Sequence, residues 1–167
     1  MQENQKTSDK MAALGPHMSI ITLHVNGLNF LIKRHRVAGW IREQDSTICC
    51  LEETHLSSND KHRLRVKGWK MILRPNDNQK KVSVAIILSD EIDCKPKKTR
   101  DKDGHYIMIK GTFQQEDIIL INMCAPNTGA LKYIKQLLTD LKGEIDSNAI
   151  IVGDLNTPPH THTYVNG

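Results

Sequence analysis

Apolar and polar residues alternate along this chain in a way that predicts strands ending at polar turns. The segment "SIITLHVNGLN" places Ile21, Leu23 and Val25 on one side and then breaks at Asn26-Gly27, which predicts a strand followed by a turn. In "STICCLEETHL" four consecutive apolar residues precede two glutamates, as expected for a strand that is covered on both faces. Further strands are predicted at Trp69–Leu73, Val82–Leu88, Tyr106–Gly111, Ile118–Met123 and Ala149–Val152.

Two segments have the spacing of helices that bury one face. The first, "FLIKRHRVAGWIREQ", has Leu31, Ala38 and Ile41 at helical spacing and several basic residues for an outer face. The second is "LKYIKQLLTDLKGEI", with an apolar stripe formed by Leu131, Ile134, Leu138 and Leu141. The basic segment "DCKPKKTRDKDG" is interpreted as an exposed loop. The pattern predicts a mixed α/β domain in which strands outnumber helices.

Composition narrows the fold class more than it narrows the function. At 167 residues the chain suits one domain or part of a larger one, and only 4% of it is aromatic, so Ile, Leu and Val must build the core. Lys and Arg outnumber Asp and Glu by 23 to 19, a modest excess that favours a polyanionic partner without resembling a dedicated nucleic-acid-binding arm.

The remaining composition indicates no membrane segment and a reducing compartment. No apolar stretch approaches the roughly 18 residues needed to span a bilayer, and the N-terminus has no signal-peptide apolar segment. Cys49 and Cys50 are adjacent, while Cys94 and Cys124 stand alone, which is neither metal-binding nor secretory spacing. We therefore expect an intracellular protein, nuclear or cytoplasmic, whose residues 1–18 form a disordered leader.

Polar side chains follow three of the predicted strands at the point where each strand ends. Asn26, Glu53, and the pair Asp154 and Asn156 all have this placement, so a sheet could gather them at one edge. Converging oxygen ligands are what Mg²⁺ prefers, together with waters and phosphate oxygens. Such a site suits phosphodiester cleavage, because the ion stabilises charge on phosphate oxygens while amides and carboxylates position the attacking water.

Eight segments of the chain together resemble one protein superfamily. They are "TLHVNGLN", "RHRVAGWI", "CCLEETHL", "HRLRVKGW", "GHYIMIKG", "APNTGA", "IKQLLTDL" and "GDLNTP", and they span about Ile20 to Pro158. In this order they resemble the endonuclease/exonuclease/phosphatase superfamily, which includes deoxyribonuclease I and abasic-site endonucleases. The more specific resemblance is to the N-terminal endonuclease of mammalian long interspersed element retrotransposons. An ordered set of motifs is far more specific than any one of them.

The resemblance implies a fold and a set of site residues. The implied fold is a β-sandwich flanked by helices, of the deoxyribonuclease I type, with a Mg²⁺-dependent site that nicks DNA. By motif, Glu53 matches the metal-binding glutamate and Asn26 matches the first-strand asparagine of the site. Asp154 and Asn156 match the residues that orient the water and the scissile phosphate, and Asn127 in "APNTGA" matches a substrate-binding position.

The chain departs from the family pattern at several positions. Glu52 stands where a glutamine commonly precedes the metal-binding glutamate, Cys124 replaces the tyrosine of a "YAPN" motif, and Ser83 replaces a glycine. A thiol is a weaker hydrogen-bond donor than a phenol. The pattern is lost after Pro158, so we expect 19–159 to be the N-terminal portion of the domain, its C-terminal part missing, and 160–167 a diverged tail.

These departures predict a chain that has inherited a nuclease site but hydrolyses DNA very slowly or not at all. The family's C-terminal "SDH" motif is absent, and losing acid–base assistance typically lowers a rate by about 10²–10⁴-fold. DNA and RNA are the candidate partners, and the sequence identifies no protein partner. Two alternatives stay open: a non-catalytic fragment that binds nucleic acid weakly, and a poorly folded product with no selected role.

Several site residues also have plainer interpretations. Asp154 and Asn156 suit a turn in which their side chains bond the local backbone, and Asn26 before Gly27 has the same interpretation. His160 and His162 suggest replacement bases or metal ligands, but two nearby histidines are a weak signal and a frayed tail is the simpler interpretation.

Overall fold

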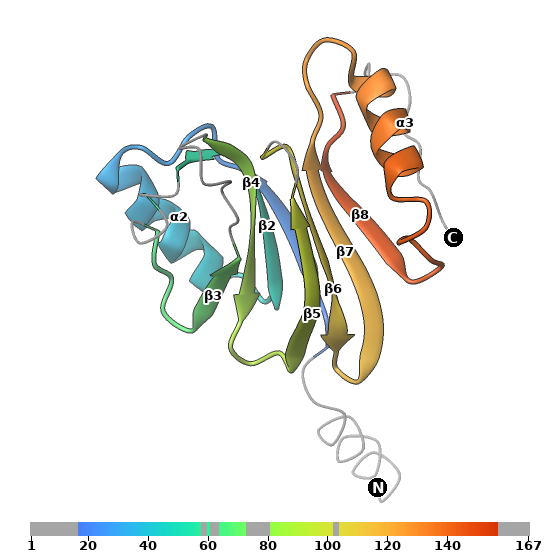
Figure 1. Ribbon diagram of the computed structural model, residues 1–167. Helices are drawn as coiled ribbons and strands as arrows, with labels where there is room; N and C mark the ends of the chain where they lie inside the picture. Colours follow the sequence, from blue (N-terminus) through green and yellow to red (C-terminus); the bar gives the residue numbers. More distant parts are fainter. Residues whose placement is uncertain (1–16, 58–59, 61–63, 73–80, 102–103, 157–167) are drawn as a thin grey trace, which may run out of the picture.

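The computed structural model describes residues 17–57, 60, 64–72, 81–101 and 104–156 (Figure 1). Within these described residues the elements are, in chain order, β1 (Ile20–His24), α2 (Leu31–Glu43), β2 (Ile48–Leu56), β3 (Trp69–Ile72), β4 (Val82–Ser89), β5 (Cys94–Asp101), β6 (Tyr106–Phe113), β7 (Glu116–Cys124), α3 (Ala130–Asp140) and β8 (Ala149–Asp154). The expected leader and tail, including His160 and His162, fall almost entirely outside the described residues, so those expectations stay untested.

The strands form two four-stranded sheets that lie face to face between the two helices (Figure 1). The first sheet has the order β1-β2-β4-β3 and the second the order β5-β6-β7-β8. The pairs β1–β2 and β7–β8 are parallel, and all other neighbours are antiparallel. Strands β1 and β8 are each the last strand of their sheet and contact each other, so two strand ends from distant parts of the chain meet at one side of the sandwich.

Three apolar clusters hold these four layers together. Helix α2 covers the outer face of the first sheet, and α3 covers the outer face of the second. The consecutive apolar residues of β2 divide between the two faces of their sheet: Cys49 and Leu51 pack toward α2, while Ile48 and Cys50 pack against the second sheet. This confirms the prediction of a strand covered on both faces, because only such a strand buries every residue of an unbroken apolar run.

The helices lie where the sequence predicts them, but their buried faces differ in part from the expected stripes. In α2, Ala38 and Ile41 are buried as predicted, whereas Leu31 is 59% exposed. In α3 the buried face is formed by Leu137 and by Leu141 just beyond its end. Leu131 and Leu138 are exposed, so the predicted stripe was wrong at those two positions. None of the described helices is long and apolar enough to cross a membrane.

The basic segment that was interpreted as a loop is largely strand β5. It pairs antiparallel with β6 from Cys94 to Asp101, and the register shifts between Pro96 and Lys98. An edge strand tolerates a proline at such an irregularity, because proline lacks the N–H that regular pairing requires. The loop interpretation was therefore wrong, since backbone pairing with β6 decides the conformation and the charges suit an edge position.

Candidate active site

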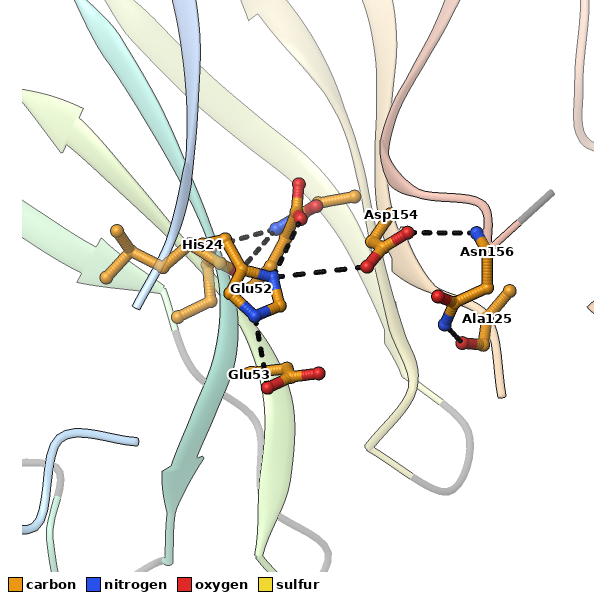
Figure 2. A network of polar contacts seen from close by, with 9 residues as sticks. His24, Glu52, Glu53, Ala125, Asp154 and Asn156 are labelled. Carbon is orange, nitrogen blue, oxygen red and sulfur yellow. Dashed lines mark hydrogen bonds and ion pairs between the residues drawn. The ribbon is translucent and has the colours of Figure 1, made fainter. Parts of the chain in front are cut away.

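Four ionisable side chains from three strands converge at the side of the sandwich where β1 and β8 meet. Figure 2 shows the imidazole of His24 among the carboxylates of Glu52, Glu53 and Asp154. His24 Nε2 lies 3.1 Å from Glu53 Oε2, and His24 Nδ1 lies 3.8 Å from Glu52 Oε2 and 4.0 Å from Asp154 Oδ2. Ligand atoms of His24, Glu52 and Asp154 all lie within 4.8 Å of one another.

The two-residue period of the strands explains why three of these side chains meet. Along each strand they continue the row of residues that packs between the sheets: His24 follows Ile20, Glu52 follows Cys50, and Asp154 follows Val152. Direct pairing aligns the rows, because His24 is opposite Glu52 and Cys124 is opposite Asp154. The inner face is thus apolar along its length and charged at its end.

Glu53 joins the group through an irregularity in β2. In a regular strand its side chain would point away from that of Glu52, but the register with β4 shifts after Glu52 and the φ of Glu53 is 50°. The turn after β1 holds this conformation, because Gly27 donates its N–H to the Glu53 carbonyl oxygen at 2.6 Å. Two consecutive carboxylates can therefore face one imidazole.

Asp154 and Asn156 form the local turn that their plainer interpretation predicts. Asp154 Oδ1 accepts a hydrogen bond from the Asn156 N–H at 2.9 Å, and Asn156 Nδ2 donates to the Ala125 carbonyl oxygen at 2.5 Å (Figure 2). The other carboxylate oxygen of Asp154 faces His24. The turn therefore fixes the Asp154 carboxylate without preventing it from facing the site.

The structure does not bring Asn26 or Asn127 into this group of charges. Asn26 is exposed in the turn after β1, with φ 48°, and its carbonyl oxygen accepts a hydrogen bond from Lys33 at 2.8 Å. Asn127 is exposed in the segment between β7 and α3. Arg34 donates to the carbonyl oxygens of Leu28 and Asn29, so two of the basic residues of α2 bind the preceding turn. The roles implied for both asparagines remain predictions.

His24 is the residue that reasoning from the sequence missed. His24 lies two residues before Asn26, the asparagine that the resemblance identified, and on the same inner face of β1 as Ile20. The alternation of β1 contained this signal, because residues 20, 22 and 24 must face the same way. What the alternation could not reveal is that the ends of β2 and β8 lie within reach of residue 24.

Burial and neighbouring carboxylates raise the pKa of two groups at the site. Glu52 is only 6% exposed, and burial, together with the charge of Asp154, raises the pKa of its carboxyl, an effect that His24 partly opposes. Burial and the same carboxylates raise the pKa of the Cys124 thiol to about 11. Cys124 is therefore a neutral, buried thiol near pH 7 and not a reactive one.

This set of side chains fits a divalent cation. His24 offers a ring nitrogen, and Glu52 and Asp154 offer carboxylate oxygens; a cation among them would offset the repulsion by Asp154 that, after burial, contributes most to the raised pKa of Glu52. Glu53, the metal ligand that the resemblance implies, is not part of this group of three. The described residues thus contain a donor set of the kind that could hold a metal ion, at the edge where the sequence predicted one.

The raised pKa of Glu52 gives a testable effect on stability. A carboxyl whose pKa is higher in the folded protein than in the unfolded chain lowers stability as pH rises through that interval. We therefore expect Glu52→Gln to raise the free energy of unfolding at pH 8, without metal, by on the order of 1 kcal/mol, and to have no such effect near pH 4. Urea unfolding at both pH values in EDTA measures it.

The Glu52→Gln experiment has a control variant and a result that would contradict the prediction. Glu91 is an exposed acidic residue in the turn after β4, so Glu91→Gln should change the free energy of unfolding by less than about 0.5 kcal/mol at either pH. A Glu52→Gln protein that is less stable than the parent at pH 8 would show that the contact with His24 outweighs the cost of burying the charge.

Solved structures of several proteins have the same fold. D. rerio TDP2, crystallised with a single-strand DNA product, is 19% identical with a TM-score of 0.64, and the match covers 84% of this chain and 61% of that one. The endonuclease domain of TRAS1, a telomere-specific non-LTR retrotransposon, is 11% identical with a TM-score of 0.60, covering 84% and 61%. An AP endonuclease from Archaeoglobus fulgidus is 22% identical with a TM-score of 0.61, covering 86% and 59%.

These similarities show the fold of the chain and the share of each related structure that it covers. The chain spans less than two thirds of the length of each of these three chains, and the shared fold is the sandwich with flanking helices that the resemblance implied. The model of the Endonuclease/Exonuclease/phosphatase family matches residues 23–167, which include the four ionisable residues of the site. This chain therefore belongs to the Endonuclease/Exonuclease/phosphatase family.

Proposed function

We propose that this chain is the N-terminal portion of a retrotransposon-derived endonuclease whose inherited reaction is the metal-dependent hydrolysis of DNA phosphodiester bonds. The observation that carries the proposal is the convergence of Glu52, Glu53 and Asp154 at the ends of strands from both sheets. The DNA product bound to D. rerio TDP2 and the retrotransposon origin of the TRAS1 domain support DNA as the substrate class.

In this proposal the carboxylates bind a divalent cation, and Mg²⁺ is the ion that the resemblance implies. Glu53 is the proposed metal ligand, and the bound ion would stabilise negative charge on the phosphate. Asp154 and Asn156 orient the attacking water and the scissile phosphate. Their mutual hydrogen bond supports this role, because it holds the Asp154 carboxylate in one orientation. The resemblance further implies a catalytic role for Asn26 and contact with the substrate for Asn127.

We further propose that hydrolysis by this chain alone is very slow or absent. One observation supports a weakened site: a neutral, 7% exposed Cys124 stands where the family pattern has a tyrosine. Weak DNA binding without cleavage is then the activity that remains. Because such binding rests on phosphate contacts, its affinity should fall steeply as salt is added.

Nicking of supercoiled plasmid in Mg²⁺ tests the proposal. We expect the chain to nick at least about 10²-fold more slowly than the same chain extended by a family-type C-terminal half. In the extended chain, Glu53→Ala and Asp154→Ala should abolish nicking, whereas Glu91→Ala, which removes an exposed carboxylate after β4, should leave it unchanged. Efficient nicking by the unextended chain that disappears in Glu53→Ala would disprove the proposed inactivity.

A further inference from the structure

We infer that His24 makes this a mixed nitrogen and oxygen metal site, formed by His24, Glu52 and Asp154, that binds a borderline transition-metal dication such as Zn²⁺ in preference to Mg²⁺. The inference rests on the proposed function, because it names the ion of the same strand-end site. It differs from the resemblance because an imidazole is a ligand, in addition to the carboxylates that the proposed function assigns to the ion.

The orientation of the imidazole is the first argument. Nε2 faces Glu53 at 3.1 Å, while Nδ1 faces both Glu52 and Asp154. A carboxylate that accepts the hydrogen of one ring nitrogen fixes the tautomer and leaves a lone pair on the other nitrogen. In His24 the ring nitrogen near the two other possible ligands, Glu52 and Asp154, is Nδ1. Histidines that bind metals are held in this way by a carboxylate or carbonyl behind the ring.

The separations between the donor atoms are the second argument. Zn²⁺ binds imidazole nitrogen and carboxylate oxygen at about 2.0–2.2 Å, so two ligands of a tetrahedral ion lie about 3.4 Å apart. The separations of 3.8 Å and 4.0 Å from Nδ1 to Glu52 and Asp154 are within about 0.6 Å of that value. All three donor atoms lie within 4.8 Å of one another, so the carboxylates need to move inward to close the set around one ion.

The charge and the solvent exposure of the site are the third argument. Three carboxylates face one imidazole, so a dication brings positive charge to a group of acidic side chains. Glu52 is almost fully buried, whereas the side chains of His24 and Asp154 are 45% and 30% exposed, which leaves one side open to solvent or a phosphate. Imidazole is a good ligand for Zn²⁺, while Mg²⁺ prefers oxygen ligands and retains its waters.

Metal titration of the full chain tests the inference without any measurement of nicking. The metal-free protein is titrated with Zn²⁺ alone, by competition with a fluorescent chelator, and with Mg²⁺ alone by calorimetry. We expect one Zn²⁺ per chain, bound about tenfold more tightly than Mg²⁺ or better. His24→Asn exchanges the ring nitrogen for an amide donor, and should weaken Zn²⁺ binding about tenfold or more while changing Mg²⁺ affinity less than about threefold.

Controls separate this site from the other histidines and cysteines of the chain. His35→Asn removes an exposed histidine of α2 and should leave both titrations unchanged. Glu52→Gln should weaken Zn²⁺ binding as His24→Asn does. Co²⁺ gives a spectroscopic readout, because its visible absorption depends on its ligands and should change in His24→Asn but not in His35→Asn. Circular dichroism confirms that each variant is folded.

Two contrary outcomes can be told apart. Tighter binding of Mg²⁺ than of Zn²⁺, or a Zn²⁺ titration that His24→Asn leaves unchanged, would overturn this inference and leave the proposed Mg²⁺ site of the inherited reaction intact. Failure of both ions to bind would overturn this inference together with the cation in the proposed function.

Discussion

Replacing Gly153 with alanine is expected to lower the free energy of unfolding by about 4 kcal/mol or more. Gly153 has φ 124°, a conformation that side chains rarely adopt, and a Cβ atom there would lie 1.8 Å from the carbonyl oxygen of Met123. This oxygen belongs to the backbone of β7, to which β8 pairs, so neither strand can move aside without losing the pairing. The pairing that precedes Asp154 would therefore be disrupted, and with it the position of this carboxylate.

Urea unfolding followed by circular dichroism measures the loss, and Gly39 offers the matched control. Gly39 lies within α2 and no atom lies within 4 Å of an added Cβ, so Gly39→Ala should instead raise the free energy of unfolding by about 0.5–1 kcal/mol. If Gly153→Ala costs less than about 1 kcal/mol, the backbone of β8 cannot run as close to Met123 as the structure indicates.

The close approach at Gly153 shows what the sequence could and could not predict. The aliphatic run before "GDLN" predicted a strand that delivers Asp154 to an edge, and β8 confirms that strand. The glycine itself gave no indication that it lies against Met123, because the contact depends on parallel pairing with β7. Similarly, the unbroken apolar run of β2 predicted burial on both faces, since no other arrangement removes every such residue from water.

The predictions that were wrong or incomplete have different physical reasons in different elements. In α3, Leu137 and Leu138 are neighbours in the sequence, and periodicity alone cannot decide which of them faces the sheet. In β5 the backbone bonds to β6 outweigh side chains that suit solvent. At the site, the carboxylates follow from strand ends, but the approach of His24 to Asp154 depends on the packing of β1 against β8. Short-range patterns therefore predicted the elements better than the contacts between them.

Asn122 is the polar residue that the sequence gave least reason to notice. It lies within the apolar run of β7 and is fully buried, and its Nδ2 donates at 3.0 Å to the carbonyl oxygens of Leu51 in β2 and Ala85 in β4. Its own Oδ1 has no hydrogen-bond partner among the described residues. One side-chain amide thus connects the second sheet to two strands of the first. Its partner Leu51 directly precedes Glu52, and Asn122 itself pairs with Val152, two residues before Asp154.

We expect Asn122→Asp to lower the free energy of unfolding by about 4 kcal/mol at pH 7, because it places a carboxylate against two carbonyl oxygens in the core. Burial should raise the pKa of the new carboxyl above its value in the unfolded chain, so the loss should shrink as pH falls toward 4 and the carboxyl becomes neutral. The measurement is urea unfolding of parent and variant at both pH values, since only their difference isolates this position.

Asn122→Leu separates the charge from the lost hydrogen bonds. It removes both donors without adding a charge, so it should cost about 2–4 kcal/mol and show no change with pH relative to the parent. If Asn122→Asp and Asn122→Leu lose the same free energy at pH 4 and pH 7, water or a cation reaches position 122 and the core between the sheets is not closed there. If both lose less than about 1 kcal/mol, the amide contributes little to holding the sheets together, and the alignment of β8 with β2 at the site must come from the apolar cluster alone.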